Sequence, residues 1–172
     1  TMYPSMGLAC IGAVAEEQGC EVKVVDCEAL GYSYERLEEI IKQFSPDLIG
    51  MQTFCNTINR NLEIAKRAKR NIDKKIKVVL GGVQATLLSD EYCKDENVDF
   101  VVKGEGEIIF RNLIQSLKNN EVDFSNIRGL VWKKDGKIVN NQAQEMIKNL
   151  DTLPFPARHL FQLDKYYPSA QI

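Results

Sequence analysis

The sequence predicts a three-layer α/β domain built around a parallel sheet, and two observations carry this prediction. Apolar runs such as Val78–Leu80 and Phe100–Val102 alternate with segments of helical periodicity, as expected for strands that are buried on both faces. These two runs are followed by glycines, at Gly81-Gly82 and at Gly104, before the next helical pattern begins. Because parallel strands end at one edge of a sheet, the glycines would meet where open α/β sheets bind ligands.

Local signals justify each element in the first half of the chain. Gly19 stops a helix of small and apolar residues, Ser33 can cap an amphipathic helix, and Pro46 ends that helix. The residues between these signals alternate between helical periodicity and short β-branched runs. In order, the sequence predicts a helix at 7–18, a strand at 22–25, a helix at 34–44 and a strand at 47–52.

The second half continues the same alternation. A helix around residues 62–68 is followed by a strand at 77–80, a short helix from about 86 to 92, a strand at 100–102 and a helix through 110–117. This order predicts right-handed crossovers and a Rossmann-like or flavodoxin-like sheet. Such folds normally begin with a central strand, so the first strand is either cut away or reduced to residues 2–4, and we expect a truncated start.

Beyond residue 119 the sequence changes in character. Two β-rich runs flank Asp135-Gly136, which is typical of a β-hairpin. Pro154 and Pro156 then favour an extended path. We therefore predict a main domain at residues 1–118, a hairpin appendage at 119–149, and a linker at 150–172 that leads to a domain not included in the chain.

Composition excludes several classes of function. Lys and Arg are interspersed with acidic residues at a net charge of -2, so no basic surface for nucleic acid is predicted. No apolar run reaches the ~20 residues that span a bilayer, and no signal peptide is evident, so we expect a cytoplasmic protein that binds no membrane. The five cysteines form no CxxC pair and there is a single histidine, so neither a disulfide framework nor a metal site is predicted.

Small and polar residues follow three of the predicted strands. Gln52 and Thr53 end one strand, and Gly81, Gly82 and Ala85 open the helix after another. Each group has an ordinary structural role, as a helix cap or as a tight turn that needs glycine. The functional interpretation is that together they line a crevice in which a ligand approaches bare main chain.

The stretch Gly104-Glu105-Gly106-Glu107 follows the next strand. It is either a loop whose second carboxylate favours a helix N-terminus or a binding loop for a ligand rich in amide and hydroxyl groups. Two carboxylates suit a phosphate poorly, and no dinucleotide fingerprint or Walker loop is present. His159 lies in the predicted linker, and Cys55 has no neighbouring histidine, so neither is expected to act in catalysis.

Six stretches together resemble the N-terminal cobalamin-binding domain of cobalamin-dependent radical S-adenosylmethionine enzymes, an Fe–S oxidoreductase family. Each stretch alone is weak, but the combination is specific and spans nearly the whole chain. The matching stretches are residues 4–9, 24–26, 46–50, 80–86, 99–107 and 150–159.

The resemblance implies a cobalamin site at the carboxyl ends of the strands. Gly81 and Gly82 would line the nucleotide tail of the cofactor, and Gln52 and Thr53 would hydrogen-bond it. The other implied cofactor-binding residues are Gln84, which stands where relatives often have histidine, Ala85, and Gly104, Glu105, Gly106 and Glu107, which would border the corrin. The stretch at residues 2–7 has no histidine, so cobalt would lack a protein histidine ligand.

The resemblance also implies a partner. The family's radical domain holds a [4Fe–4S] cluster and S-adenosylmethionine through a Cys-x-x-x-Cys-x-x-Cys motif, which this chain lacks. That domain would begin shortly after residues 165–167, so the chain itself is expected to bind a cofactor without catalysing a reaction. The parent enzyme would perform methyl transfer or a radical rearrangement.

Two alternatives and one question of assembly stay open from the sequence. The chain could be a flavodoxin-like signalling or protein-interaction domain that binds no cobalamin, although a full acidic phosphoacceptor site is missing. It could also be half of a nucleotide-sugar-dependent transferase. A truncated sheet could in addition exchange strands between chains and form a homodimer.

Overall fold

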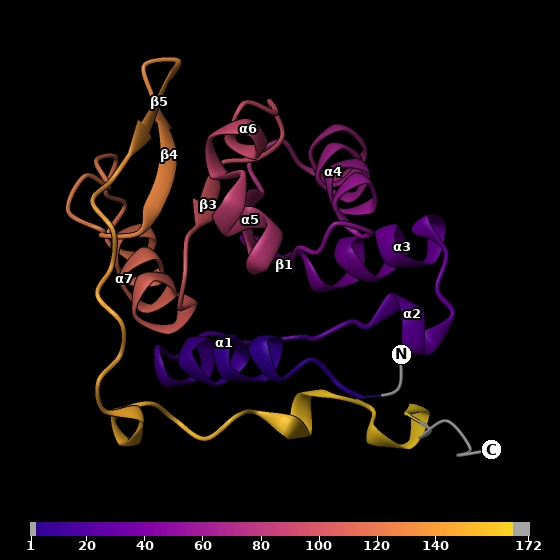
Figure 1. Ribbon diagram of the computed structural model, residues 1–172. Helices are drawn as coiled ribbons and strands as arrows, with labels where there is room; N and C mark the ends of the chain where they lie inside the picture. The colour runs from indigo at the N-terminus through magenta and orange to yellow at the C-terminus, as the bar shows by residue number, and fades with distance from the viewer. Residues whose placement is uncertain (1–2, 167–172) are drawn as a thin grey trace.

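Five strands form one sheet in the order β1-β2-β3-β4-β5. The computed structural model describes residues 3–166 (Figure 1). The first three strands pair in parallel, and the last two continue the sheet in antiparallel pairs. The strands are β1 (Leu48–Gln52), β2 (Lys77–Gly81), β3 (Phe100–Val102), β4 (Leu130–Lys134) and β5 (Lys137–Asn140).

Helices connect the parallel strands and follow the last of them. The α-helices are α1 (Met6–Glu17), α2 (Cys27–Leu30), α3 (Tyr34–Phe44), α4 (Ile58–Arg67), α5 (Val83–Leu87), α6 (Ser89–Cys93) and α7 (Gly106–Lys118). A π-helical turn, η1 (Ala68–Ile72), prolongs α4, and three 3₁₀ turns lie near the end of the chain: η2 (Leu150–Thr152), η3 (Arg158–Leu160) and η4 (Leu163–Lys165).

The core has two halves, one on each face of the sheet. Val79 packs into a cluster with side chains of α1 and α7, whereas Val78 and Leu80 pack into a cluster with side chains of α4, α5 and α6. Successive residues of a buried parallel strand point to opposite faces, which is why β2 is apolar throughout. This arrangement confirms the predicted three-layer α/β class.

The predicted elements agree with the structure except in two places. The helix expected at 86–92 is two short helices, α5 and α6, and it begins earlier, directly after Gly82. The strand expected at 22–25 is wrong, because residues 21–26 have no strand partner among the described residues. Met2, part of the expected remnant of a first strand, lies outside the described residues.

The segment 21–26 nevertheless behaves like a strand without a neighbour. No backbone hydrogen bond joins residues 21–25 to another part of the described chain. Val22 packs against the cluster under α1, while Lys23 reaches over the ring of Phe44 in α3, 5.6 Å from its centroid. Strand β1 also lacks a partner, within residues 3–166, on the side away from β2. Two rows of unpaired backbone are therefore present in the described part of the chain, one along residues 21–25 and one along the side of β1 away from β2.

The end of the chain lies across α1 as a strap, which we define as residues 150–166. The Ala157 N–H donates to the Ala9 carbonyl oxygen at 2.9 Å, and Ala157 and Phe161 are buried. Leu160 lies so close to Gly12 that a Cβ there would be 2.8 Å from its Cδ1 atom. The predicted linker is therefore packed against the domain, as the yellow segment in Figure 1 shows.

Candidate functional site

The carboxyl ends of β1, β2 and β3 form the candidate site. Gln52 ends β1, Gly81 ends β2, and Gly104 follows β3 after one intervening residue. The start of α1 joins this edge, because the Ser5 hydroxyl donates to Gln52 Oε1 at 2.5 Å and Ser5 also caps α1 by accepting from the Leu8 N–H. Four segments that are distant in sequence therefore meet at one edge of the sheet.

Thr53 holds the first two strand ends together. Its side chain is fully buried, and its hydroxyl donates to the Gly81 carbonyl oxygen at 2.7 Å and accepts from the Ala85 N–H at 3.0 Å. Its main-chain N–H also donates to Gly81, at 2.7 Å. The hydrogen bonds of this hydroxyl are made within the protein, so Thr53 supports this edge of the sheet from beneath.

Gly82 turns the chain tightly over Thr53. Its φ of 99° lies in the region that glycine tolerates, and a Cβ at this position would be 3.0 Å from the Thr53 carbonyl oxygen. Gln84, two residues further on, donates through Nε2 to the Tyr92 hydroxyl at 3.0 Å. This contact ties α5 to α6 and engages the amide nitrogen of Gln84 within the protein.

Thr86 joins the Gly82 turn to the loop after β3. Its hydroxyl donates to the Gly82 carbonyl oxygen at 3.0 Å and accepts from the Gly104 N–H at 2.9 Å. Gly104 has a φ of 78°, and a Cβ there would meet nothing within 4 Å. Gly104 is therefore exposed, with open space on its Cβ side.

The carboxylates of Glu105 and Glu107, which follow Gly104, each lie near a different part of the chain. Glu105 accepts from the Ile147 N–H at 2.6 Å and so holds the segment that follows the hairpin. Glu107 lies near Cys10 of α1, and burial together with this carboxylate raises the pKa of the Cys10 thiol. Gly106 begins α7, where a Cβ would be 3.1 Å from Ile11 Cδ1. These three residues connect β3 to its neighbours.

The structure thus brings seven of the ten predicted residues into one site. They share the edge formed by the β1 and β2 ends, α5 and the loop after β3: Gln52, Thr53, Gly81, Gly82, Gln84, Ala85 and Gly104. Sequence reasoning did not assign Ser5 or Thr86 to the site. A hydroxyl residue four positions after the turn glycine is a usable signal, because helical threonines bond back to that carbonyl.

Exposed apolar side chains rim the same edge. Met6, Phe54, Val83 and Leu87 are all exposed, and each directly follows a residue of the edge, namely Ser5, Thr53, Gly82 or Thr86. Exposed apolar groups beside convergent polar groups are typical of ligand sites. These four residues were also missed from the sequence.

Three of the four segments that build the edge carry no charge, whereas the loop after β3 contains Lys103, Glu105 and Glu107. Of these, Lys103 donates to Asn140 and Glu105 accepts from Ile147 within the protein. Residues 3–15, 48–59 and 78–89 contain no Asp, Glu, Lys, Arg or His. His159 bonds to Glu16 at 2.9 Å, at the far end of α1 from Ser5, and a helix of 12 residues is about 18 Å long. The polar groups at this edge are hydroxyls, amides and main chain, and several of them donate within the protein. Uncharged groups of this kind fit the amide-rich periphery of a corrin.

Comparison with known proteins agrees with this chemistry. The family model described as the B12 binding domain matches residues 1–114. An uncharacterized methyltransferase of Pyrococcus horikoshii is 32% identical over 96% of this chain, which spans 36% of that protein.

Solved structures share the fold. The radical S-adenosylmethionine methyltransferase TsrM from Kitasatospora setae has a TM-score of 0.71 and 21% identity over 83% of this chain and 28% of its own. The cobalamin-dependent radical enzyme OxsB, solved with aqua-cobalamin and S-adenosylmethionine, has a TM-score of 0.75 and 18% identity over 90% of this chain and 21% of its own. This chain therefore spans well under half of each of these proteins.

Proposed function

This chain belongs to the B12-binding domain family, and from that membership we propose that it is the cobalamin-binding module of a radical S-adenosylmethionine enzyme. The observation that carries the proposal is the rim of hydroxyl, amide and glycine main-chain groups at the carboxyl end of the sheet, where only the loop after β3 brings charged residues. A neutral ligand rich in amides can cover such a rim without burying an unpaired charge. The family match gives no support to the alternative of a signalling domain that binds no cobalamin.

We assign the residues of the chain to distinct tasks. Gly81 and Gly82 would line the nucleotide tail, Gln52 would offer its amide at the same place, and Gly104 would offer main chain to the corrin side chains. Thr53, which has its hydrogen bonds within the protein, would keep the Gly81 end in place. Bound cobalamin supplies a cobalt centre that can carry a methyl group, and no described histidine at this edge could ligate it.

The strap fits a role as the connection to a catalytic domain. Tyr166 donates to Asp26 at 3.0 Å, and Asp26 ends the segment 21–26 while its other oxygen caps α2. The strap thus returns the chain to the side of the molecule on which this segment ends. In the proposed parent enzyme, the radical domain with its [4Fe–4S] cluster and S-adenosylmethionine follows there, and residues 1–118 form the cobalamin module.

We also place the expected first strand in the structure. Segment 21–26 has no strand partner and β1 has a free side among the described residues, and the doubly wound order known for flavodoxin-like folds has one strand between the corresponding two. A parallel strand that leads into Ser5 and α1 would satisfy both rows. A second copy of the chain that pairs with β1 is the competing proposal and would give a homodimer.

A titration with hydroxocobalamin tests the proposed function. We expect saturable 1:1 binding and a change of the visible spectrum toward a form without an axial nitrogen ligand. Two exposed valines give a matched pair of variants, because Val83 lies on the rim and Val122 lies elsewhere, 66% and 86% exposed. Val83→Glu should weaken binding at least tenfold and Val122→Glu should not; the absence of saturable binding by the unsubstituted protein would refute the function.

A further inference from the structure

Two threonine hydroxyls link the ends of three consecutive strands. Thr53 bridges the end of β1 to the end of β2, and Thr86 bridges the turn after β2 to the loop after β3. Thr53 is fully buried, whereas Thr86 is only partly buried. The second link therefore lies nearer to the surface that a ligand would cover.

We propose that Thr86 is a positioning residue for the cofactor, whose hydroxyl fixes the Gly82 turn and the Gly104 loop relative to each other. This inference rests on the proposed function, because both glycines are assigned to one ligand. The tail crevice lies at the Gly82 turn and the corrin contacts lie at the Gly104 loop. Cobalamin can engage both only when the two are at the correct separation.

The contact to Gly104 sets this threonine apart from an ordinary helical threonine. A threonine in a helix often donates to the carbonyl four residues earlier, as Thr86 does to Gly82. Thr86 also accepts from a main-chain N–H that is 18 residues further along the chain. That second bond joins two loops and has no role in holding α5 together.

The surroundings of Gly104 make this bond decisive for the loop. Nothing lies within 4 Å of a Cβ placed on Gly104, so no side chain packs on that side of the residue. Glu105, the next residue, is held from the hairpin side through its bond to Ile147. Without the Thr86 hydroxyl, Gly104 loses the hydrogen-bond acceptor that directs its N–H toward α5.

The test compares three substitutions. Thr86→Val keeps the size of the side chain and removes both hydrogen bonds, while Thr86→Ser keeps the hydroxyl. Thr152→Val is the control, because the Thr152 hydroxyl donates to a main-chain oxygen, that of Asn149, within the strap. For each protein, hydroxocobalamin affinity is measured by titration, and exchange of the Gly104 amide is measured without cofactor.

We expect Thr86→Val to weaken hydroxocobalamin binding about tenfold, the size of effect that follows from losing one or two hydrogen bonds. Its Gly104 amide should exchange faster than in the unsubstituted protein. Thr86→Ser should restore both properties to within about threefold, and Thr152→Val should change neither. If Thr86→Val does not fold, Thr86→Ala, which leaves space for a water molecule, takes its place in the same comparison.

Three results would overturn the inference, and they are distinguishable. If the unsubstituted protein and Thr86→Val bind hydroxocobalamin equally well, the positioning role is wrong and the proposed function stands. If the unsubstituted protein does not bind, the proposed function itself fails. Faster exchange at Gly104 with unchanged affinity would also refute the positioning role, because the loop would then move without consequence for the cofactor.

Discussion

The two ends of the sheet are built from opposite chemistry. At the amino end, residues 66–77 contain seven Lys or Arg and residues 90–99 contain five Asp or Glu. At the carboxyl end, residues 3–15, 48–59 and 78–89 contain no charged residue, and charge enters only with the loop after β3. Paired charges can tie strands together, whereas an uncharged rim leaves a surface that a neutral ligand can cover. The molecule separates the end that stabilises the sheet from the end at which we propose that the cofactor binds.

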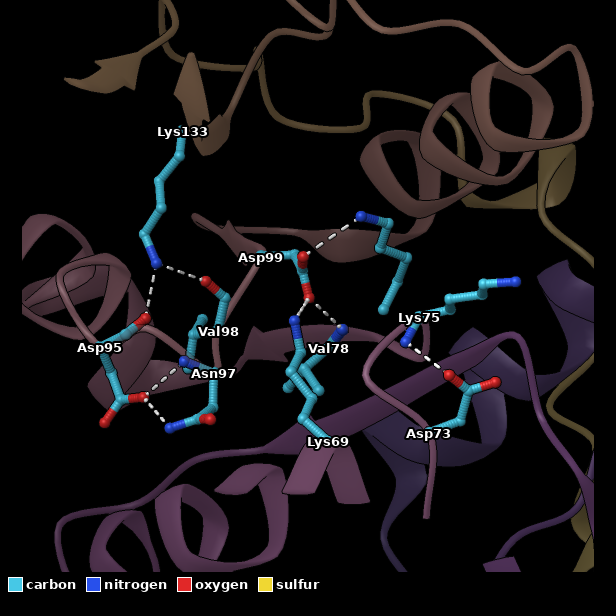
Figure 2. A network of polar contacts seen from close by, with 10 residues as sticks. Lys69, Asp73, Lys75, Val78, Asp95, Asn97, Val98, Asp99 and Lys133 are labelled. Carbon is cyan, nitrogen blue, oxygen red and sulfur yellow. Dashed lines mark hydrogen bonds and ion pairs between the residues drawn. The ribbon is translucent and has the colours of Figure 1, made fainter. Parts of the chain in front are cut away.

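Figure 2 shows the polar contacts at the amino end of the sheet. The Asp99 carboxylate accepts from Lys69 at 2.6 Å, from Lys77 at 3.4 Å and from the Val78 N–H at 2.9 Å, which joins η1, β2 and the start of β3. Lys133 of β4 donates to the carbonyl oxygens of Asp95 and Val98 at 2.6 and 2.9 Å. One carboxylate and one ammonium group thus join four elements at this end.

The largest expected effect comes from removing the negative charge of Asp99 at the amino end of the sheet. Asp99→Asn should lower the free energy of unfolding by roughly 2–3 kcal/mol, because the Lys69 ammonium would lose its partner at a place where little water reaches it. The side chains of Lys69 and Asp99 are 14% and 18% exposed. Urea unfolding followed by fluorescence of Trp132, the single tryptophan, measures the change.

The control for Asp99→Asn is a surface pair. Glu91→Gln removes the partner of Lys94, and both side chains of this pair are 63% exposed, so its urea midpoint should barely move. Hydroxocobalamin affinity should be unchanged in folded Asp99→Asn, since the site lies at the other end of the sheet. Equal midpoints for the two variants would show that the charges at the amino end do not hold the sheet together.

Two glycines at the carboxyl end should differ in their tolerance of a side chain. Gly82→Ala should cost roughly 2–3 kcal/mol, because an unfavourable φ is combined with a contact to the Thr53 carbonyl oxygen. Gly104→Ala should cost only about 1 kcal/mol, since its φ is unfavourable but the space around it is open. Thermal unfolding measures both, and equal losses would contradict the packing of Gly82 over Thr53.

The carboxyl end also shows what the sequence could and could not reveal. Gly81-Gly82 and Gly104 were predicted because a glycine directly after an apolar run favours a tight turn or a close approach to main chain. The buried position of Thr53 could not be predicted, because a threonine at a strand end can face a ligand or the core. The register of β1 against β2, which brings Thr53 to Gly81, determines which of the two it faces. The contact of Glu105 could not be predicted for a related reason: its partner Ile147 is 42 residues away and follows an irregular segment.

The fold was more predictable than the site. Helix α3 follows from the Ser33 cap and a strong apolar stripe, and the structure has that cap, with the Ser33 hydroxyl accepting from the Arg36 N–H. The prediction of a strand at 22–25 was wrong because a strand forms only where a neighbouring strand can share backbone hydrogen bonds with it. Local β-propensity cannot report whether that neighbour is present.

A smaller effect is expected where the strap meets the carboxyl side. Tyr166 donates to Asp26, and burial together with this carboxylate raises the pKa of Tyr166 above its ordinary value near 10. Because the pKa of Tyr166 is raised in the folded state, its contact with Asp26 contributes fully to the free energy of unfolding below about pH 10. This contribution is lost as the pH rises further through the folded-state pKa. Tyr166→Phe should therefore lose about 1 kcal/mol at neutral pH, and this difference should shrink in alkali.

Urea unfolding of both proteins from neutral pH to about pH 11 measures that difference. The matched control is Tyr3→Phe, since Tyr3 is 67% exposed and its substitution should leave stability unchanged. A difference between Tyr166→Phe and the unsubstituted protein that grows in alkali would contradict the sign of the pKa shift. The strap would then be held by the contacts of Ala157 and Phe161 alone.

The last prediction concerns amide exchange along the free side of β1 and involves no substitution. The Asp47 carbonyl accepts from the Lys77 N–H, and the Thr53 N–H donates to the Gly81 carbonyl. Because backbone groups alternate along a parallel pair, the N–H groups of Ile49 and Met51 point toward β2, and the N–H of Gly50 points away from it. The Met51 amide should exchange slowly with solvent and the Gly50 amide quickly. In β2, which has a strand on each side, adjacent amides should both be slow.

Slow exchange at Gly50 would show that β1 has a second partner, and its concentration dependence would identify that partner. Protection that increases with protein concentration indicates pairing between two copies of the chain, because association follows mass action. Protection independent of concentration indicates a strand from the same chain. Fast exchange at Gly50 at every concentration would leave both rows of backbone, in β1 and in residues 21–25, free for the strand that we place between them.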